Sequence, residues 1–147
     1  MIKKNKFLLA DDDSDDRDFF KTALLQMIPG AELITVNDGK QAVEWLSGCS
    51  TDHLPSAIII DYNMPHLNGL EVVEQLKTLL NKPRIVIISM YAERKELKLF
   101  SAARVDGYLA KTTPASELIV SLVKIMAGDK IMTVGSQQKE GRPPRNS

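Results

Sequence analysis

This 147-residue chain has one cysteine, no net charge and no long apolar run. Its single cysteine, Cys49, cannot form an internal disulfide, so a reducing compartment is the default expectation. Basic and acidic residues number 19 each, and the resulting net charge of zero predicts no general attraction to nucleic acid or to an anionic membrane.

The longest apolar runs are also too short for a membrane. None approaches the length of a membrane-spanning helix, and the run at residues 7–10, after the basic start, is too short for a secretory signal. We therefore expect a cytoplasmic protein that binds neither nucleic acid nor membrane directly.

Two common ligand-binding patterns are missing as well. No glycine-rich loop follows the first apolar segment, and the three aspartates that stand there would repel phosphates without a metal ion, which excludes a nucleotide-binding loop of that kind. The calcium-binding loop of EF-hands is also absent.

What the sequence does contain is an alternation of two kinds of segment. Short apolar segments rich in β-branched residues are typical of strands buried on both faces of a parallel sheet; they lie at residues 7–10, 33–36, 57–60, 85–88 and 108–110. Between and after them come helical periods, near residues 14–28, 40–46, 70–79, 93–103 and 115–127. This order predicts an α/β fold, a doubly wound five-stranded parallel sheet with five helices on its two faces.

The last helix and the end of the chain have their own signals. Thr113 is the expected N-cap of the fifth helix, Pro114 its first residue and Gly128 its stop. Beyond Gly128 the pattern weakens, and residues 131–134 fit either a strand stub or a linker. We expect one domain over residues 1–128, followed by a linker or mobile tail over residues 129–147.

Polar side chains follow four of the five predicted strands. Asp11 and Asp12 follow the first strand, Asp61 the third and Ser89 the fourth, and the fifth runs into Lys111. In doubly wound sheets, ligands bind beyond the carboxyl ends of the strands. The sequence therefore predicts that carboxylates, a hydroxyl and an ammonium converge at one edge.

This set of groups suggests a phosphoryl-transfer chemistry. Asp11, Asp12 and Asp61 would repel one another unless a cation compensates, and Mg²⁺ suits them because it accepts one or two carboxylates and keeps other positions for water and phosphate oxygens. A carboxylate beside Mg²⁺, facing a lysine and a hydroxyl, can attack phosphorus and form an acyl phosphate.

Taken in order, the motifs resemble the receiver domain of two-component response regulators, over about residues 5–127. The matching motifs are the acidic pair Asp11-Asp12, Ile-Ile-Ile-Asp61-Tyr-Asn-Met-Pro65 with Gly69, Val-Ile-Ile-Ser89, and Gly107-Tyr-Leu-Ala-Lys111. Each is weak alone, but together they are specific. The resemblance implies a flavodoxin-like sheet with strand order 2-1-3-4-5.

The resemblance also implies a role for each matching residue. Asp61 would accept a phosphoryl group from a histidine kinase or a histidine phosphotransfer protein, and Ser89 and Lys111 would contact its oxygens. Ser89 and Tyr108 would form the switch that changes the face made by helix four, strand five and helix five. The expected metal ligands are Asp11, Asp12, Asp61 and the backbone carbonyl of Asn63. Such a domain is a signalling switch rather than an enzyme, since it catalyses only its own phosphorylation and dephosphorylation.

Output and partners stay open at this point. The Lys111-Thr-Thr-Pro114 motif is more like receivers joined to LuxR-type DNA-binding domains, so the chain is either a stand-alone receiver that docks to another protein or a part of a longer regulator. The wide apolar stripe of residues 118–126 fits generous core packing or a partner surface, including a homodimer through the same face.

Competing interpretations are weaker. A magnesium-dependent phosphohydrolase of similar fold would carry a second aspartate two residues after the nucleophile, where this chain has Asn63. A degenerate receiver is disfavoured by the complete acidic, hydroxyl and lysine set. Asp13, Asp15 and Asp16 are expected to be capping or solvated charges rather than ligands.

Overall fold

A single parallel sheet organises the molecule. The computed structural model describes residues 6–49, 53–62, 69–79, 84–90 and 93–133. Within these residues the sheet has six strands in the order β2-β1-β3-β4-β5-β6, all parallel. The strands are β1 (Lys6–Ala10), β2 (Glu32–Val36), β3 (Ala57–Asp61), β4 (Arg84–Ser89), β5 (Gly107–Ala110) and β6 (Ile131–Met132).

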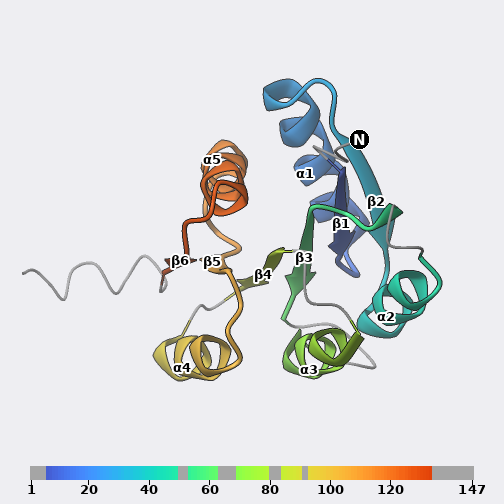
Figure 1. Ribbon diagram of the computed structural model, residues 1–147. Helices are drawn as coiled ribbons and strands as arrows, with labels where there is room; N and C mark the ends of the chain where they lie inside the picture. The colour runs from blue at the N-terminus through green and yellow to red at the C-terminus, as the bar shows by residue number, and fades with distance from the viewer. Residues whose placement is uncertain (1–5, 50–52, 63–68, 80–83, 91–92, 134–147) are drawn as a thin grey trace, which may run out of the picture.

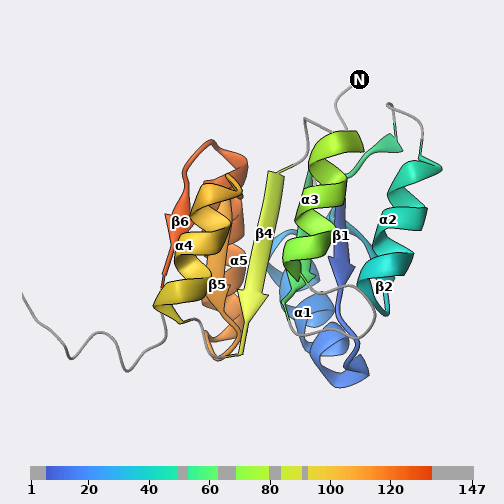
Figure 2. The same cartoon turned by 90° about the horizontal axis from the view of Figure 1, so that it is seen from below.

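Helices cover both faces of this sheet (Figure 1). They are α1 (Ser14–Met27), α2 (Gly39–Ser47), α3 (Gly69–Leu79), α4 (Arg94–Ala102) and α5 (Ala115–Met126). One face is covered by α1 and α5 and the other, which Figure 2 views from the front, by α2, α3 and α4. Each layer contributes its own apolar core, which explains why the central strands are apolar on both faces.

Strand order places the functional edge. From β1, the chain continues to β2 on one side of the sheet and later to β3 on the other, so the order reverses between β1 and β3. At such a switch point the loops leave in opposite directions and open a crevice at the carboxyl ends of the strands. Asp61 pairs in register with Ile88, which puts Ser89 one residue beyond it on the neighbouring strand.

The helix ends show how local sequence fixes the elements around this edge. The side chain of Asp13 accepts hydrogen bonds from the backbone N–H groups of Asp15 and Asp16 at 2.9 and 3.3 Å, so the expected capping role of Asp13 is confirmed. At α5 the expectation is wrong by one position. Pro114 is the N-cap, with an extended ψ of 143°, and it therefore precedes the helix instead of opening it.

The fold class expected from the sequence is confirmed, and one strand is added to it. The order 2-1-3-4-5 and the five helices are present, and β6 pairs with β5 through Gly107 and Tyr108. Because of this pairing, residues 131–132 belong to the sheet although they lie beyond Gly128. The boundary between domain and tail at residue 128 stays a prediction. No helix in the described part of the chain is long and apolar enough to cross a membrane.

Candidate functional site

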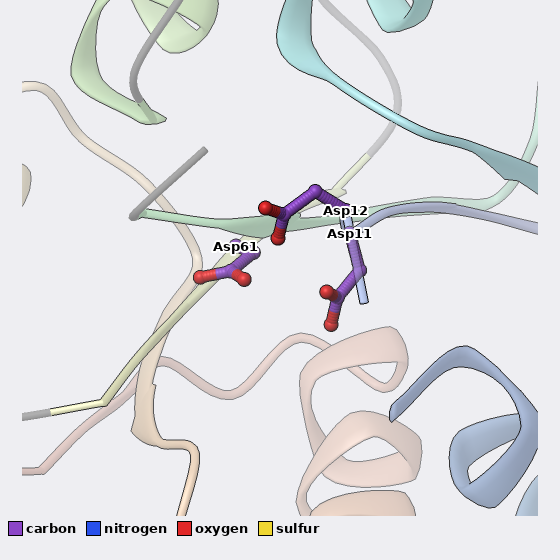
Figure 3. Close-up of side chains that lie close together, drawn as sticks. All are labelled: Asp11, Asp12 and Asp61. Atoms are coloured by element: carbon purple, nitrogen blue, oxygen red, sulfur yellow. The ribbon is translucent and has the colours of Figure 1, made fainter. Parts of the chain in front are cut away.

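Three carboxylates meet where β1 and β3 end. One oxygen from each of Asp11, Asp12 and Asp61 lies within 4.8 Å of the others. Figure 3 shows the Asp12 side chain turned toward Asp61, with Asp11 beside them. Asp11 and Asp61 are buried and Asp12 is exposed, so the cluster opens to solvent on the Asp12 side. The three carboxylates therefore converge as expected from the sequence.

Asp11 lies in an environment that disfavours its charge. Burial raises its pKa from 3.8 to about 6, and the nearby charge of Asp61 adds to the increase. The backbone N–H of Asp13, which donates to Asp11 Oδ1 at 2.9 Å, and the ammonium of Lys111 partly oppose it. A cation at this point would relieve both the desolvation and the repulsion.

Lys111 supplies part of that compensation. Its Nζ atom lies 2.7 Å from Asp61 Oδ2, 2.8 Å from Asp16 Oδ2 and 3.4 Å from Asp11 Oδ2. Burial disfavours the charge on Lys111, but the bonds to Asp16 and Asp61 outweigh it and hold the pKa of Lys111 above its usual value. The lysine is therefore charged, and it points at the expected phospho-acceptor.

Asp16 takes part in this site through a contact that was not expected from the sequence. It was expected to be a capping or solvated charge rather than a ligand, and its side chain is 37% exposed. From the first turn of α1 it also forms an ion pair with Lys111. Asp13 caps α1 and fixes where the helix begins, which turns Asp16 toward the end of β5. An aspartate in the first turn of a predicted helix fits a solvated charge equally well, so no sequence signal pointed to this contact.

The predicted switch residues meet at a glutamate. Ser89 Oγ donates to Glu96 Oε1 at 2.8 Å, and the Tyr108 hydroxyl donates to the same oxygen at 2.6 Å. All three side chains are buried. Burial and the Glu96 carboxylate raise the pKa of Tyr108 well above its usual value, so the phenol keeps its proton. Nothing in the helical period of residues 93–103 pointed to this role for Glu96, because a charged residue there fits a solvated face equally well.

The space around these groups is open enough for a small charged ligand. A cavity of about 460 Å³ is lined by carboxylates, Lys111 and Met90, and it includes Asp12, Asp16 and Asp61. Asn63, whose backbone carbonyl was predicted to be a metal ligand, lies outside the described residues. The three carboxylates present fit a hard divalent cation, because they offer oxygen ligands at close range and carry more negative charge than Lys111 balances.

The comparisons with known proteins agree with this geometry. A family model described as the response regulator receiver domain matches residues 7–123. The nitrate/nitrite response regulator protein NarL of Escherichia coli K12 is 29% identical over 123 residues, which cover 81% of this chain and 55% of NarL. The transcriptional regulatory protein PrrA of Mycobacterium tuberculosis is 29% identical over 125 residues, covering 85% of this chain and 51% of PrrA. The chain thus spans about half the length of these relatives.

Solved structures of receivers have the same fold. The receiver domain of the Francisella response regulator 1452 is 25% identical, with a TM-score of 0.73 over 84% of this chain and 98% of that one. The phosphorylated cyanobacterial phytochrome response regulator RcpA is also 25% identical, with a TM-score of 0.71 over 82% of this chain and 90% of that one. With the family match spanning most of the sheet and its acidic edge, the chain belongs to the response regulator receiver domain family, whose members are signalling domains.

Proposed function

We propose that the chain is a phosphorylation switch in which Asp61 accepts a phosphoryl group. The observation that supports this most directly is the 2.7 Å contact between Asp61 and Lys111 inside the carboxylate cluster. A buried carboxylate with a fixed ammonium beside it has a defined direction of attack and a ready counter-charge for the incoming group.

The chemical step is a displacement at phosphorus. An Asp61 oxygen forms a bond to phosphorus, the bond from phosphorus to the donor breaks, and the donor atom leaves with its electron pair. The donor is a phosphohistidine of a kinase or phosphotransfer protein, or a small acyl phosphate. Lys111 and Ser89 contact phosphoryl oxygens, so the charge that develops there meets one ammonium and one hydroxyl.

Asp11, Asp12 and Asp61 would hold Mg²⁺, with the carbonyl of Asn63 completing the protein ligands. When bound, Mg²⁺ supplies positive charge for the phosphoryl oxygens. The chain's own part is to place two buried carboxylates and one exposed carboxylate at a common point, at the end of β3 and directly after β1. The same groups would catalyse loss of the phosphoryl group to water, so the chemistry stays within the domain.

The output surface in this proposal is the face of α4, β5 and α5. α5 buries Leu118, Ile119, Leu122 and Ile125 against the sheet. Apolar area also remains outside: Leu99 on α4 and Val120 and Val123 on α5 are 43–49% exposed. The apolar stripe of α5 therefore serves the core and also leaves a surface for a downstream protein or a second receiver.

The test uses a small phosphodonor in place of the kinase. The protein is incubated with acetyl phosphate, with and without Mg²⁺, and its intact mass is followed. We expect a gain of one phosphate that requires Mg²⁺ and is lost in Asp61→Asn. A matched control is Asp18→Asn, which removes an exposed carboxylate from α1 and should leave the gain unchanged. No gain in the folded wild-type protein would refute the proposal.

A further inference from the structure

A buried glutamate connects the two residues of the proposed switch. Glu96 Oε1 accepts a hydrogen bond from Ser89 at 2.8 Å and from Tyr108 at 2.6 Å. Glu96 is 9% exposed, and the other two side chains are fully buried. Hydrogen bonds to a carboxylate are about twice as strong as neutral ones, and removal from water strengthens them. Glu96 is thus a strong competitor for the Ser89 hydroxyl.

The hydroxyl of Ser89 cannot serve two acceptors at once. A serine hydroxyl carries one hydrogen to donate, and here Ser89 donates it to Glu96. Under the proposed function, the same hydrogen is donated to a phosphoryl oxygen on Asp61. The Ser89–Glu96 bond must therefore break when Asp61 is phosphorylated, so its strength opposes phosphorylation.

Tyr108 determines what happens to Glu96 after that bond breaks. A buried carboxylate without a partner is strongly destabilising. The Tyr108 hydroxyl remains a donor to Glu96, and its ring is held in place by stacking on Phe100, with ring centroids 5.6 Å apart. Tyr108 therefore keeps Glu96 partnered after Ser89 has moved.

We propose that Glu96 is a positioning residue of the switch, which withholds the Ser89 hydroxyl from Asp61 until a phosphoryl group competes for it, while Tyr108 keeps the carboxylate partnered afterwards. This inference rests on the proposed function, because it concerns the donor that the phosphoryl group would recruit. It also identifies α4 as the element that responds, since the two buried residues of that helix are Glu96 and Phe100.

The experiment measures the affinity for beryllium fluoride, a phosphoryl mimic, by titration calorimetry in the presence of Mg²⁺. Glu96→Gln keeps the side-chain shape but replaces the charge-assisted bond by a neutral one, so binding should become roughly three- to tenfold tighter. Glu93→Gln is the matched control, because it removes one negative charge from an exposed position at the start of the same helix. It should change the affinity less than about twofold.

A double-mutant cycle separates this mechanism from a general change in charge or packing. In a Ser89→Ala background the hydroxyl is gone, so Glu96→Gln should no longer tighten binding. Tyr108→Phe should act in the opposite direction and weaken binding by roughly threefold or more, because the bound state would leave Glu96 without its donor. This second variant also provides a test if Glu96→Gln does not fold.

Each other outcome counts against the inference. Unchanged or weaker binding by folded Glu96→Gln, the same tightening in the Ser89→Ala background, or unaltered binding by Tyr108→Phe would each overturn it. Failure of the proposed function looks different. In that case the wild-type protein itself would show no binding of beryllium fluoride that requires Mg²⁺ and Asp61.

Discussion

At the scale of single residues, the site is a group of like charges around one cation. Asp11, Asp16 and Asp61 all lie within 3.4 Å of Lys111 Nζ, and Asp12 adds a further carboxylate at the surface. A structure that gathers these charges without using them would lose stability to repulsion and desolvation. Such a cluster is better explained by a positively charged ligand that binds the carboxylates and by a phosphoryl group whose oxygens accept hydrogen bonds from Lys111.

The raised pKa of Asp11 gives the first prediction. An unperturbed aspartate has a pKa of 3.8, whereas the pKa of Asp11 in the folded protein is about 6. At pH values between the two, the folded state therefore binds more protons than the unfolded state. The free energy of unfolding should therefore fall as the pH rises from about 4 to about 6, by roughly 2–3 kcal/mol from this group. Urea denaturation across this range, in the presence of a chelator, measures the effect.

Asp11→Asn provides the reference, because it keeps the shape and cannot ionise. Other groups titrate in both proteins, so the quantity of interest is the wild-type free energy of unfolding minus that of the variant. We expect this difference to become less favourable to the wild type as the pH rises through the window. A difference that is constant with pH would contradict the described environment of Asp11.

Asp16 gives the second prediction. Its carboxylate lies 2.8 Å from Lys111 Nζ, so under the proposed function it would compete with an incoming phosphoryl group for the same ammonium. Asp16→Asn should raise the initial rate of phosphorylation by acetyl phosphate by roughly two- to fivefold, and it should cost less than about 1 kcal/mol of stability because the side chain is partly exposed. If Asp18→Asn, an exposed change on the same helix, has an equal effect, bulk charge explains the rate and Asp16 has no special role.

Some residues of the site were predictable from the sequence and others were not. Asp11, Asp61 and Lys111 were predictable because each follows a buried strand, and parallel strands end at a common edge. Glu96 and Asp16 were not, since they come from helices, where the direction of a side chain depends on how the helix packs. Local sequence places a charge on a helix but does not say whether it faces solvent or a buried hydroxyl.

At the scale of elements, α5 and β4 approach β5 closely at its first residue. A Cβ atom added to Gly107 would lie 2.5 Å from Ile125 Cδ1 and 3.2 Å from Val86 Cγ1. These neighbours belong to α5 and β4, so β5 is held between them without room for a side chain at this point. The strand carries Tyr108 and leads into Lys111, which makes its position important for the site.

Gly107→Ala is therefore expected to destabilise the protein by about 1–3 kcal/mol, because Ile125 and the short side chain of Val86 must both shift. Gly30→Ala is the matched control. A Cβ atom there meets nothing within 4 Å, so stability should change by less than about 0.5 kcal/mol. Chemical denaturation of both variants checks the prediction, and equal stabilities would show that β5 is not packed as described.

Element prediction succeeded where periodicity was strong and failed at the boundaries. The five main strands and five helices follow from apolar runs and helical periods, because burial on one or two faces imposes those periods. Pro114 was placed one position too far into α5, since proline fits both before and within a first helical turn. The two-residue β6 gave no period to detect, and it exists because β5 leaves an unpaired edge beside it.

At the scale of the whole molecule, two halves of the fold contain different kinds of groups. The β1–β3 edge gathers the charged groups, and the α4-β5-α5 side contains the buried Ser89–Glu96–Tyr108 contacts and the exposed apolar residues. The two regions meet through β4, which ends in Ser89, and through Lys111 after β5. Asp61 pairs with Ile88, the residue before Ser89, so a charge added at Asp61 would lie next to the strand that ends in the buried Ser89–Glu96–Tyr108 contacts.

The central claim is that Asp61 itself becomes an acyl phosphate. The most direct measurement is to treat the protein with acetyl phosphate and Mg²⁺, reduce it with borohydride, and locate the modified residue by peptide mass spectrometry. An acyl phosphate is reduced to the alcohol, so we predict homoserine in place of Asp61 and at no other aspartate. Homoserine at position 11 or 12 would contradict the account. So would a protein in which every aspartate is unmodified after incubation with acetyl phosphate and Mg²⁺.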